Sequence, residues 1–221
     1  GNVFDVVQVA EDGAPKLLPL RAFLDDVMFD AWDVVLHYDR SRGIQATRGA
    51  EDWGRWLRQA LGSEATSLGE TRDPAAALEL IDHYLLRSLN LQNVVATHAP
   101  STGGPVPQRI AVVIDFAEFV VPRGDAVSLG AGFSANVVKT LAWANDPGIL
   151  HANIATVLIS EGLHDLNELV VQNPHVASLH VPLPSEADML MITSDRLRIS
   201  GTISRQTPVS LVGRPSSGLR A

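Results

Sequence analysis

The sequence predicts an α/β protein, a three-layer α/β/α sandwich around a central, mostly parallel five-stranded sheet. Two observations indicate this class. Several short runs, of which residues 110–114 (Ile-Ala-Val-Val-Ile) are the clearest, are apolar without polar alternation, as in strands buried on both faces of a sheet. These runs alternate with segments whose apolar residues recur at helical spacing, and such helical crossovers join parallel strands.

The composition fits a folded domain and excludes several functional classes. Of 221 residues, 46% are hydrophobic and 19% charged, enough for one large domain. A net charge of −8 and only two lysines, Lys16 and Lys139, give no basic footprint for nucleic acid. The chain has no Cys, which excludes disulfides, thiolate metal sites and a Cys nucleophile. No apolar run reaches the roughly 18 residues of a membrane span and no signal peptide opens the chain. We therefore expect a cytoplasmic protein without a membrane partner.

The first part of the chain predicts two strands separated by a helix. Residues 3–9 alternate well enough for a strand, which a turn-like stretch closes. Residues 17–29 have apolar side chains at helical spacing, with Pro19 suited to the first turn. Residues 32–38 form the next strand, and a loop over residues 39–49 follows it.

Two helices are expected before the central strand. Residues 51–61 place Trp53 and Trp56 on one helical face, and we interpret this pair as core packing. Asp73 caps the second helix, which begins at Pro74 and extends to about residue 90. Residues 94–96 are either a short strand or the approach to a Pro/Gly-rich loop over residues 98–107.

The second half continues the alternation. Residues 123–132 read as a loop, and Ser134 caps a helix over 135–145. Strands over 155–160 and 176–181 flank a short helix at 166–171, and another short helix extends through residue 192. We expect one domain over residues 1–195, with an N-terminal strand and helix over 1–30 and a core over 31–195. Residues 196–221 are expected to be a weakly ordered tail or the start of a lid or linker.

Several of these segments carry a family resemblance. Residues 110–115 (Ile-Ala-Val-Val-Ile-Asp) with a nearby acid resemble the Walker B strand of P-loop NTPases. Residues 155–160 resemble the AAA+ strand that ends in the polar sensor 1 residue, and residues 179–190 resemble the AAA+ stretch in which the last core strand gives way to Pro and a short helix. The resemblance covers residues 32–195 and implies a P-loop NTPase-like core. It also implies Walker B-like roles for Asp115 and Glu118, and a sensor 1-like role for Ser160.

The same comparison argues against ATP hydrolysis by this chain. A phosphate loop needs Gly-x-x-x-x-Gly-Lys-Ser/Thr, and no such string occurs. Residues 39–49, where it is expected, have Gly and Arg but no Lys-Ser/Thr pair. Glu118 lies three residues beyond Asp115, whereas the family usually has Glu directly after Asp. We therefore interpret the acid pair as vestigial.

Simpler interpretations of these residues remain open. Asp115 can be a capping carboxylate without a ligand, Glu118 a solvated acid or a partner of Arg123, and Ser160 a cap for the turn to Gly162. The seven His are scattered along the chain, and the four between residues 151 and 180 form no His-x-x-x-His or His-x-His pair. We therefore expect no metal site. The chain has no Gly-x-Ser-x-Gly, and its Gly-x-Gly at residues 130–132 lacks the third Gly of a dinucleotide site.

Two functions follow as hypotheses. The first is a non-catalytic AAA+-like domain, the N-terminal module of a larger ATPase. It would need no cofactor and would assemble with itself as a homo-oligomer, with a protein partner or with a following ATPase domain. The second is a nucleotide- or phosphate-binding enzyme that uses ATP and Mg²⁺. It would combine Asp115 and Glu118 with a ligand-binding loop formed by Arg40, Arg42, Gly43 and Arg48. A purely structural domain without a ligand is the third possibility.

Overall fold

The computed structural model describes residues 5–9, 15–98, 108–125 and 127–181. The chain divides into two compact units, residues 1–20 with 181–221, and residues 21–180. In the first unit, β1 (Asp5–Val9) pairs antiparallel with β2 (Pro15–Pro19). The expected helix over residues 17–29 therefore begins later, as α1 (Leu20–Phe23) and the π-helical turn η1 (Leu24–Met28).

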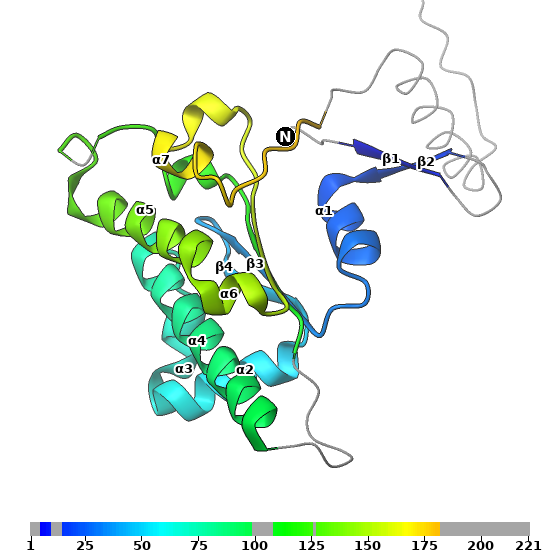
Figure 1. Ribbon diagram of the computed structural model, residues 1–221, viewed down its shortest axis with the longest axis vertical. Coiled ribbons are helices and arrows are strands. Elements are labelled where there is room, and N and C mark those ends of the chain that lie inside the picture. The colour runs from blue at the N-terminus through cyan, green and yellow to red at the C-terminus, as the bar shows by residue number, and fades with distance from the viewer. Residues whose placement is uncertain (1–4, 10–14, 99–107, 126, 182–221) are drawn as a thin grey trace, which may run out of the picture. The chain divides into compact units, whose positions relative to one another are not determined.

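The second unit is built on a four-stranded mixed sheet with the order β4-β3-β5-β6 (Figure 1). Its strands are β3 (Val34–Asp39), β4 (Gly43–Arg48), β5 (Ile110–Ile114) and β6 (Ile154–Leu158). β3, β5 and β6 are parallel, with Val34 opposite Ile110 and Ile110 opposite Ile154, whereas β4 is antiparallel to β3. The predicted mostly parallel α/β sheet is confirmed, but it has four strands and not the five expected.

The helices of this unit follow the predicted alternation. The first crossover contains α2 (Ala50–Leu61), η2 (Gly62–Glu64), α3 (Ala65–Gly69) and α4 (Pro74–His98), and Asp73 caps α4 as predicted, accepting a hydrogen bond from Ala76 N at 2.9 Å. The later part contains η3 (Ala117–Phe119), α5 (Gly130–Asn145), α6 (Pro147–His151), η4 (Leu163–Asp165) and α7 (Glu168–Val171).

Four expected features differ from the structure. Residues 94–96 continue α4, and α5 begins at Gly130, within the predicted loop. Residues 43–48, expected to be loop, form β4 because Asp39 reverses the chain: its Oδ1 accepts hydrogen bonds from Ser41 N at 2.7 Å and Arg42 N at 2.8 Å.

Residues 176–181 form no strand, and Leu179 is 79% exposed. Their alternation is a local property, while a strand also needs a partner. The expected helix through residue 192 and the tail lie outside the described residues.

The main core lies between one face of the sheet and the helices of both crossovers. Alternate residues of β3 and β5, such as Leu36 and Val112, are fully buried against side chains of α2, α4 and α5. Trp53 and Trp56 are each 5% exposed, with ring centroids 4.9 Å apart, so the predicted packing role of this pair is confirmed. Figure 1 shows α4 and α5 side by side in this helical layer.

The winding of the sheet limits where a ligand can bind. The crossovers from β3 to β5 and from β5 to β6 lead in the same direction across the sheet, and both place helices on the same face. Open α/β sheets bind ligands where the strand order reverses and a crevice opens between neighbouring strands. Between β3 and β6 the order does not reverse, so this rule predicts no crevice between these strands.

The contact between α4 and α5 depends on a buried polar pair. The Trp143 indole, 3% exposed, donates a hydrogen bond of 2.7 Å to Asp82 Oδ1, and Lys139 contacts both Asp82 and the more exposed Glu79. Replacing Asp82 by Ala leaves the indole N–H buried without a partner. We expect Asp82→Ala to lower the free energy of unfolding by about 1–3 kcal/mol in urea denaturation. Glu79→Ala, which removes only the exposed part of the ion pair, should cost less than about 1 kcal/mol. Equal losses would contradict this assignment.

Candidate functional site

Asp115 is held at the carboxyl end of the central strand β5. Its backbone N–H donates to Tyr38 O at 2.9 Å, across to the end of β3. Its side-chain Oδ2 lies 3.3 Å from His37 Nδ1 and 3.6 Å from Arg21 NH1. The carboxylate therefore faces residues of β3 and of the segment before η1.

His37 links this carboxylate to a second one. Its ring is 1% exposed, in the middle of β3, and its Nε2 lies 2.8 Å from Asp25 Oδ1 in η1. Asp25 Oδ1 also accepts a hydrogen bond from Thr47 Oγ1 at 3.1 Å. Buried polar groups need such partners because an unpaired one is costly. The network runs from Arg21 through Asp115, His37 and Asp25 to Thr47, and it fastens η1 to the sheet.

Glu118, the second acid of the predicted pair, has different neighbours. The chain turns at Phe116, which has a positive φ of 55°, and η3 carries Glu118 away from the strand. The Glu118 Oε2 atom is buried and has no hydrogen-bond partner among the residues that the structure describes. Burial raises the pKa of this carboxyl, and the nearby carboxylates of Glu161 and Asp165 raise it further.

Ser160 lies just after the end of β6, the strand next to β5 in the sheet. Its hydroxyl donates to Gly162 O at 3.2 Å, the turn contact that the sequence allowed as an alternative. The adjacent Ile159 is bonded at both backbone groups, because its N–H donates to Ile114 O at the end of β5 and its O accepts from Ala117 N at the start of η3. Asp115 and Ser160 thus follow the carboxyl ends of adjacent parallel strands.

The four residues of the predicted ligand-binding loop are divided between two places. Arg40 and Arg42 lie in the turn between β3 and β4 and Gly43 begins β4 directly after it; Arg42 Nε is 3.7 Å from Asp39 Oδ2. Arg48 lies at the other end of β4, where its NH2 donates to Asp25 O at 3.1 Å and lies 3.4 Å from Asp30 Oδ1. The structure does not bring Arg48 together with the other three.

The turn between β3 and β4 already contains an anion, the carboxylate of Asp39. The Asp39 carboxylate is almost fully buried and accepts the backbone N–H groups of Ser41 and Arg42, together with the Ser41 hydroxyl at 2.5 Å. Burial alone would raise the pKa of Asp39, but the hydrogen bonds from Ser41 and Arg42 outweigh it and lower the pKa. An ionised internal carboxylate thus occupies amides that a phosphate loop would offer to its ligand.

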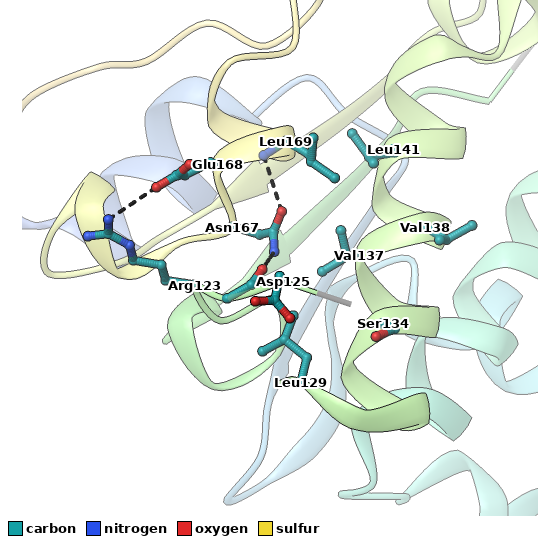
Figure 2. A pocket seen from close by; sticks show the side chains of 11 residues that line it. Arg123, Asp125, Leu129, Ser134, Val137, Val138, Leu141, Asn167, Glu168 and Leu169 are labelled. Atoms are coloured by element: carbon teal, nitrogen blue, oxygen red, sulfur yellow. Dashed lines mark hydrogen bonds and ion pairs between the residues drawn. The ribbon is translucent and has the colours of Figure 1, made fainter. Parts of the chain in front are cut away.

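A groove on the helical side was not predicted from the sequence. It has a volume of about 460 Å³ and lies between α5 and the segments around residues 123–129 and 167–169 (Figure 2). Its lining is mostly apolar: Leu129, Val137, Val138, Leu141 and Leu169. Its polar side chains include Asn167, Asp125 and an ion pair of 3.1 Å between Arg123 and Glu168.

The sequence contains a pattern that indicates the network around His37, but it contains little that indicates the groove. A single His within the apolar run Val34-Val-Leu-His-Tyr38 indicates a buried polar group that requires partners. The groove depends on how α5 and α7 pack, which no local pattern encodes.

Within the described ranges, no cluster of three or more His, Asp or Glu side chains is placed to hold a metal ion. No helix in this part of the chain is long and apolar enough to cross a membrane.

Comparison with known proteins adds a family assignment. A family model described as AAA+ chaperone, N-terminal Rossmann-like domain, matches residues 1–182. A search among curated proteins found no match. The matched region contains β1 to α7, and so it contains every residue of the network, the turn and the groove.

Gly43, one of the predicted ligand-binding residues, has a steric role that can be tested. Its φ is +78°, and a Cβ added there would lie 2.8 Å from Thr71 O and 2.9 Å from Glu70 O. We expect Gly43→Ala to lower the free energy of unfolding by about 3 kcal/mol, because strain and crowding add. Gly130→Ala is the control, since Gly130 has a φ of +70° but no atom within 4 Å of the added Cβ. It should lose only about 1–2 kcal/mol. Equal losses in urea denaturation would refute the crowding.

Glu118 predicts a pH dependence of stability. Its pKa in the folded state lies above the ordinary value of 4.5, so between these two values the folded chain binds more protons than the unfolded chain. Stability should therefore fall as pH rises through this window. Glu118→Gln should remove the fall and leave the variant more stable than the parent at neutral pH. Urea denaturation across pH 4–8 measures this, with Glu64→Gln on an exposed residue as control. A Glu118→Gln variant less stable than the parent at pH 8 would contradict the assignment.

Proposed function

The chain belongs to the family of AAA+ chaperone N-terminal Rossmann-like domains, and on this premise we propose that it is a non-catalytic protein-interaction domain. In this proposal the domain recruits or positions a protein for an ATPase, and the chemistry of ATP hydrolysis takes place elsewhere. The partner is a protein substrate, a second copy of the chain or an ATPase domain. The vestigial AAA+-like core predicted from the sequence belongs to the same proposal.

The observation that carries the proposal is the turn between β3 and β4. A phosphate loop works by offering free backbone N–H groups, a Lys and a Ser/Thr hydroxyl to the phosphates and Mg²⁺. In this turn, Ser41 N, Arg42 N and the Ser41 hydroxyl all donate to Asp39 Oδ1. A triphosphate would have to displace this carboxylate and would meet its negative charge. This argues against the alternative of a nucleotide-binding enzyme.

The state of Asp115 supports the same conclusion. A carboxylate that binds Mg²⁺ or polarises water needs access to its ligand. Asp115 instead contacts the buried His37 and the guanidinium of Arg21. These contacts support a structural role for Asp115, in which it joins the end of β5 to β3 and α1 without a ligand. The sequence had left open a related alternative, a capping carboxylate without a ligand.

Calorimetric titration with ATP, ADP and Mg²⁺ tests the non-catalytic part of the proposal. We expect no saturable binding at micromolar nucleotide, because the amides of the turn are occupied. Asp39→Asn, which keeps an acceptor oxygen but removes the charge, serves as a comparison. Micromolar binding by the parent chain that is lost in Arg42→Ala or Asp115→Ala would overturn the proposal in favour of the nucleotide-binding enzyme.

The protein-interaction part needs a separate measurement. The probe is a reduced and alkylated lactalbumin, which stays unfolded under native conditions. We expect saturable binding of this protein to the 221-residue chain in fluorescence anisotropy, with a folded, disulfide-intact lactalbumin as the control. The absence of binding, together with a monomeric chain in analytical ultracentrifugation, would leave only the purely structural domain.

A further inference from the structure

The groove between α5 and α7 presents apolar side chains that the described part of the chain leaves exposed. Val138 on α5 and Leu169 on α7 are each 65% exposed, and both line the groove. Leu129, Val137 and Leu141 continue the lining, and Val137 belongs to the main core, so the groove wall is fixed by the packing of α5 on the sheet. Exposed apolar side chains that gather around a concave surface mark binding sites for apolar groups.

The polar groups of the groove are already engaged with the protein. Asn167 Nδ2 donates to Gly124 O at 2.9 Å and to Pro122 O at 3.4 Å, while its Oδ1 accepts from Leu169 N at 3.1 Å (Figure 2). These bonds hold α7 against the loop before α5. A pocket for a small polar ligand needs polar groups that converge on the ligand. Asn167 is instead used to build the wall, and this favours an apolar occupant.

The charges at the groove favour a positive group beside that apolar occupant. The described lining contains two carboxylates, Asp125 and Glu168, and one cation, Arg123, which is paired with Glu168 at 3.1 Å. Asp125 therefore remains as the uncompensated charge of the lining. Its Oδ1 accepts Val127 N at 2.9 Å and Ser128 N at 2.8 Å, and these donors lower its pKa, so the carboxylate is ionised at neutral pH.

We propose that this groove binds a short extended segment of a client protein, with two aliphatic side chains against Val137, Val138 and Leu169 and a Lys or Arg beside Asp125. The inference rests on the proposed protein-interaction function and assigns it a place and a recognition chemistry. Burial of the exposed parts of Val138 and Leu169 supplies affinity. The carboxylate of Asp125 supplies selectivity, because it attracts a cation and repels an acidic segment.

Fluorescence anisotropy with synthetic peptides tests the proposal. The first probe is a labelled Gly/Ser-rich peptide that contains a Leu-Leu pair flanked by Lys. The second has Glu in place of Lys, and the third has Ser in place of Leu. We expect the first peptide to bind at least about tenfold more tightly than either of the others to the parent chain.

Matched variants locate the binding. Val138→Asp and Leu169→Asp place a charge on residues that are largely exposed, so the fold should be retained, and circular dichroism checks this. Both should weaken binding of the Lys-flanked peptide at least about tenfold. Leu150→Asp, on a 45% exposed residue of α6 outside the groove lining, should leave it unchanged. Asp125→Asn, which keeps the acceptor oxygen for the loop amides, should reduce the preference for Lys over Glu.

The outcomes separate this inference from the proposed function. Unchanged peptide binding in Val138→Asp and Leu169→Asp, with unfolded lactalbumin still bound, would overturn the groove and leave the interaction function in place. A preference for the Glu-flanked peptide would overturn the recognition chemistry. Failure of the parent chain to bind lactalbumin and every peptide would overturn both.

Discussion

The contact of His37 with two carboxylates is the interaction on which the arrangement of the larger unit depends. The imidazole lies in the centre of β3, where its neighbours on the strand are fully buried apolar residues. Asp25 and Asp115 reach it from η1 and from the end of β5, and both ring nitrogens are thereby paired. One side chain therefore fixes the segment before the sheet to the end of the central strand.

A second effect of local charge is that the chain supplies its own anion to the turn that follows β3. Asp39 ends β3, and its carboxylate satisfies the amides of the turn that follows. The chain can then reverse within a few residues and add β4 to the sheet. A loop that wraps phosphates must leave its amides open and stay wide. The tight turn therefore depends on a side-chain anion, and the amides that this anion occupies are not open to a bound one.

Much of the fold could be predicted because its signals are local. The apolar runs at β3, β5 and β6, the Asp73 cap of α4 and the helical stripe of Trp53 and Trp56 all reflect patterns within single elements. β4 was missed because its pairing depends on the Asp39 turn, and a strand at residues 176–181 was wrongly expected because alternation does not supply a neighbour. Asp115, Glu118 and Ser160 were identified by type, but of their contacts only the turn from Ser160 to Gly162 was predicted. The contacts of Asp115 with His37 and Arg21 join residues 78 and 94 positions apart, and no spacing rule connects them.

The single direction of winding leaves β4 and β6 as the two edges of the described sheet, and these edges differ in how strongly their side chains discourage a further strand from pairing. β4 forms one edge and carries Gln45, Thr47 and Arg48, polar side chains that discourage further strands from pairing. In the part of the chain that the structure describes, β6 forms the other edge, and its sequence Ile-Ala-Thr-Val-Leu has no charge and no proline. Exposed apolar edges are where sheets extend from molecule to molecule. A further strand would therefore meet fewer obstacles to pairing at β6 than at β4.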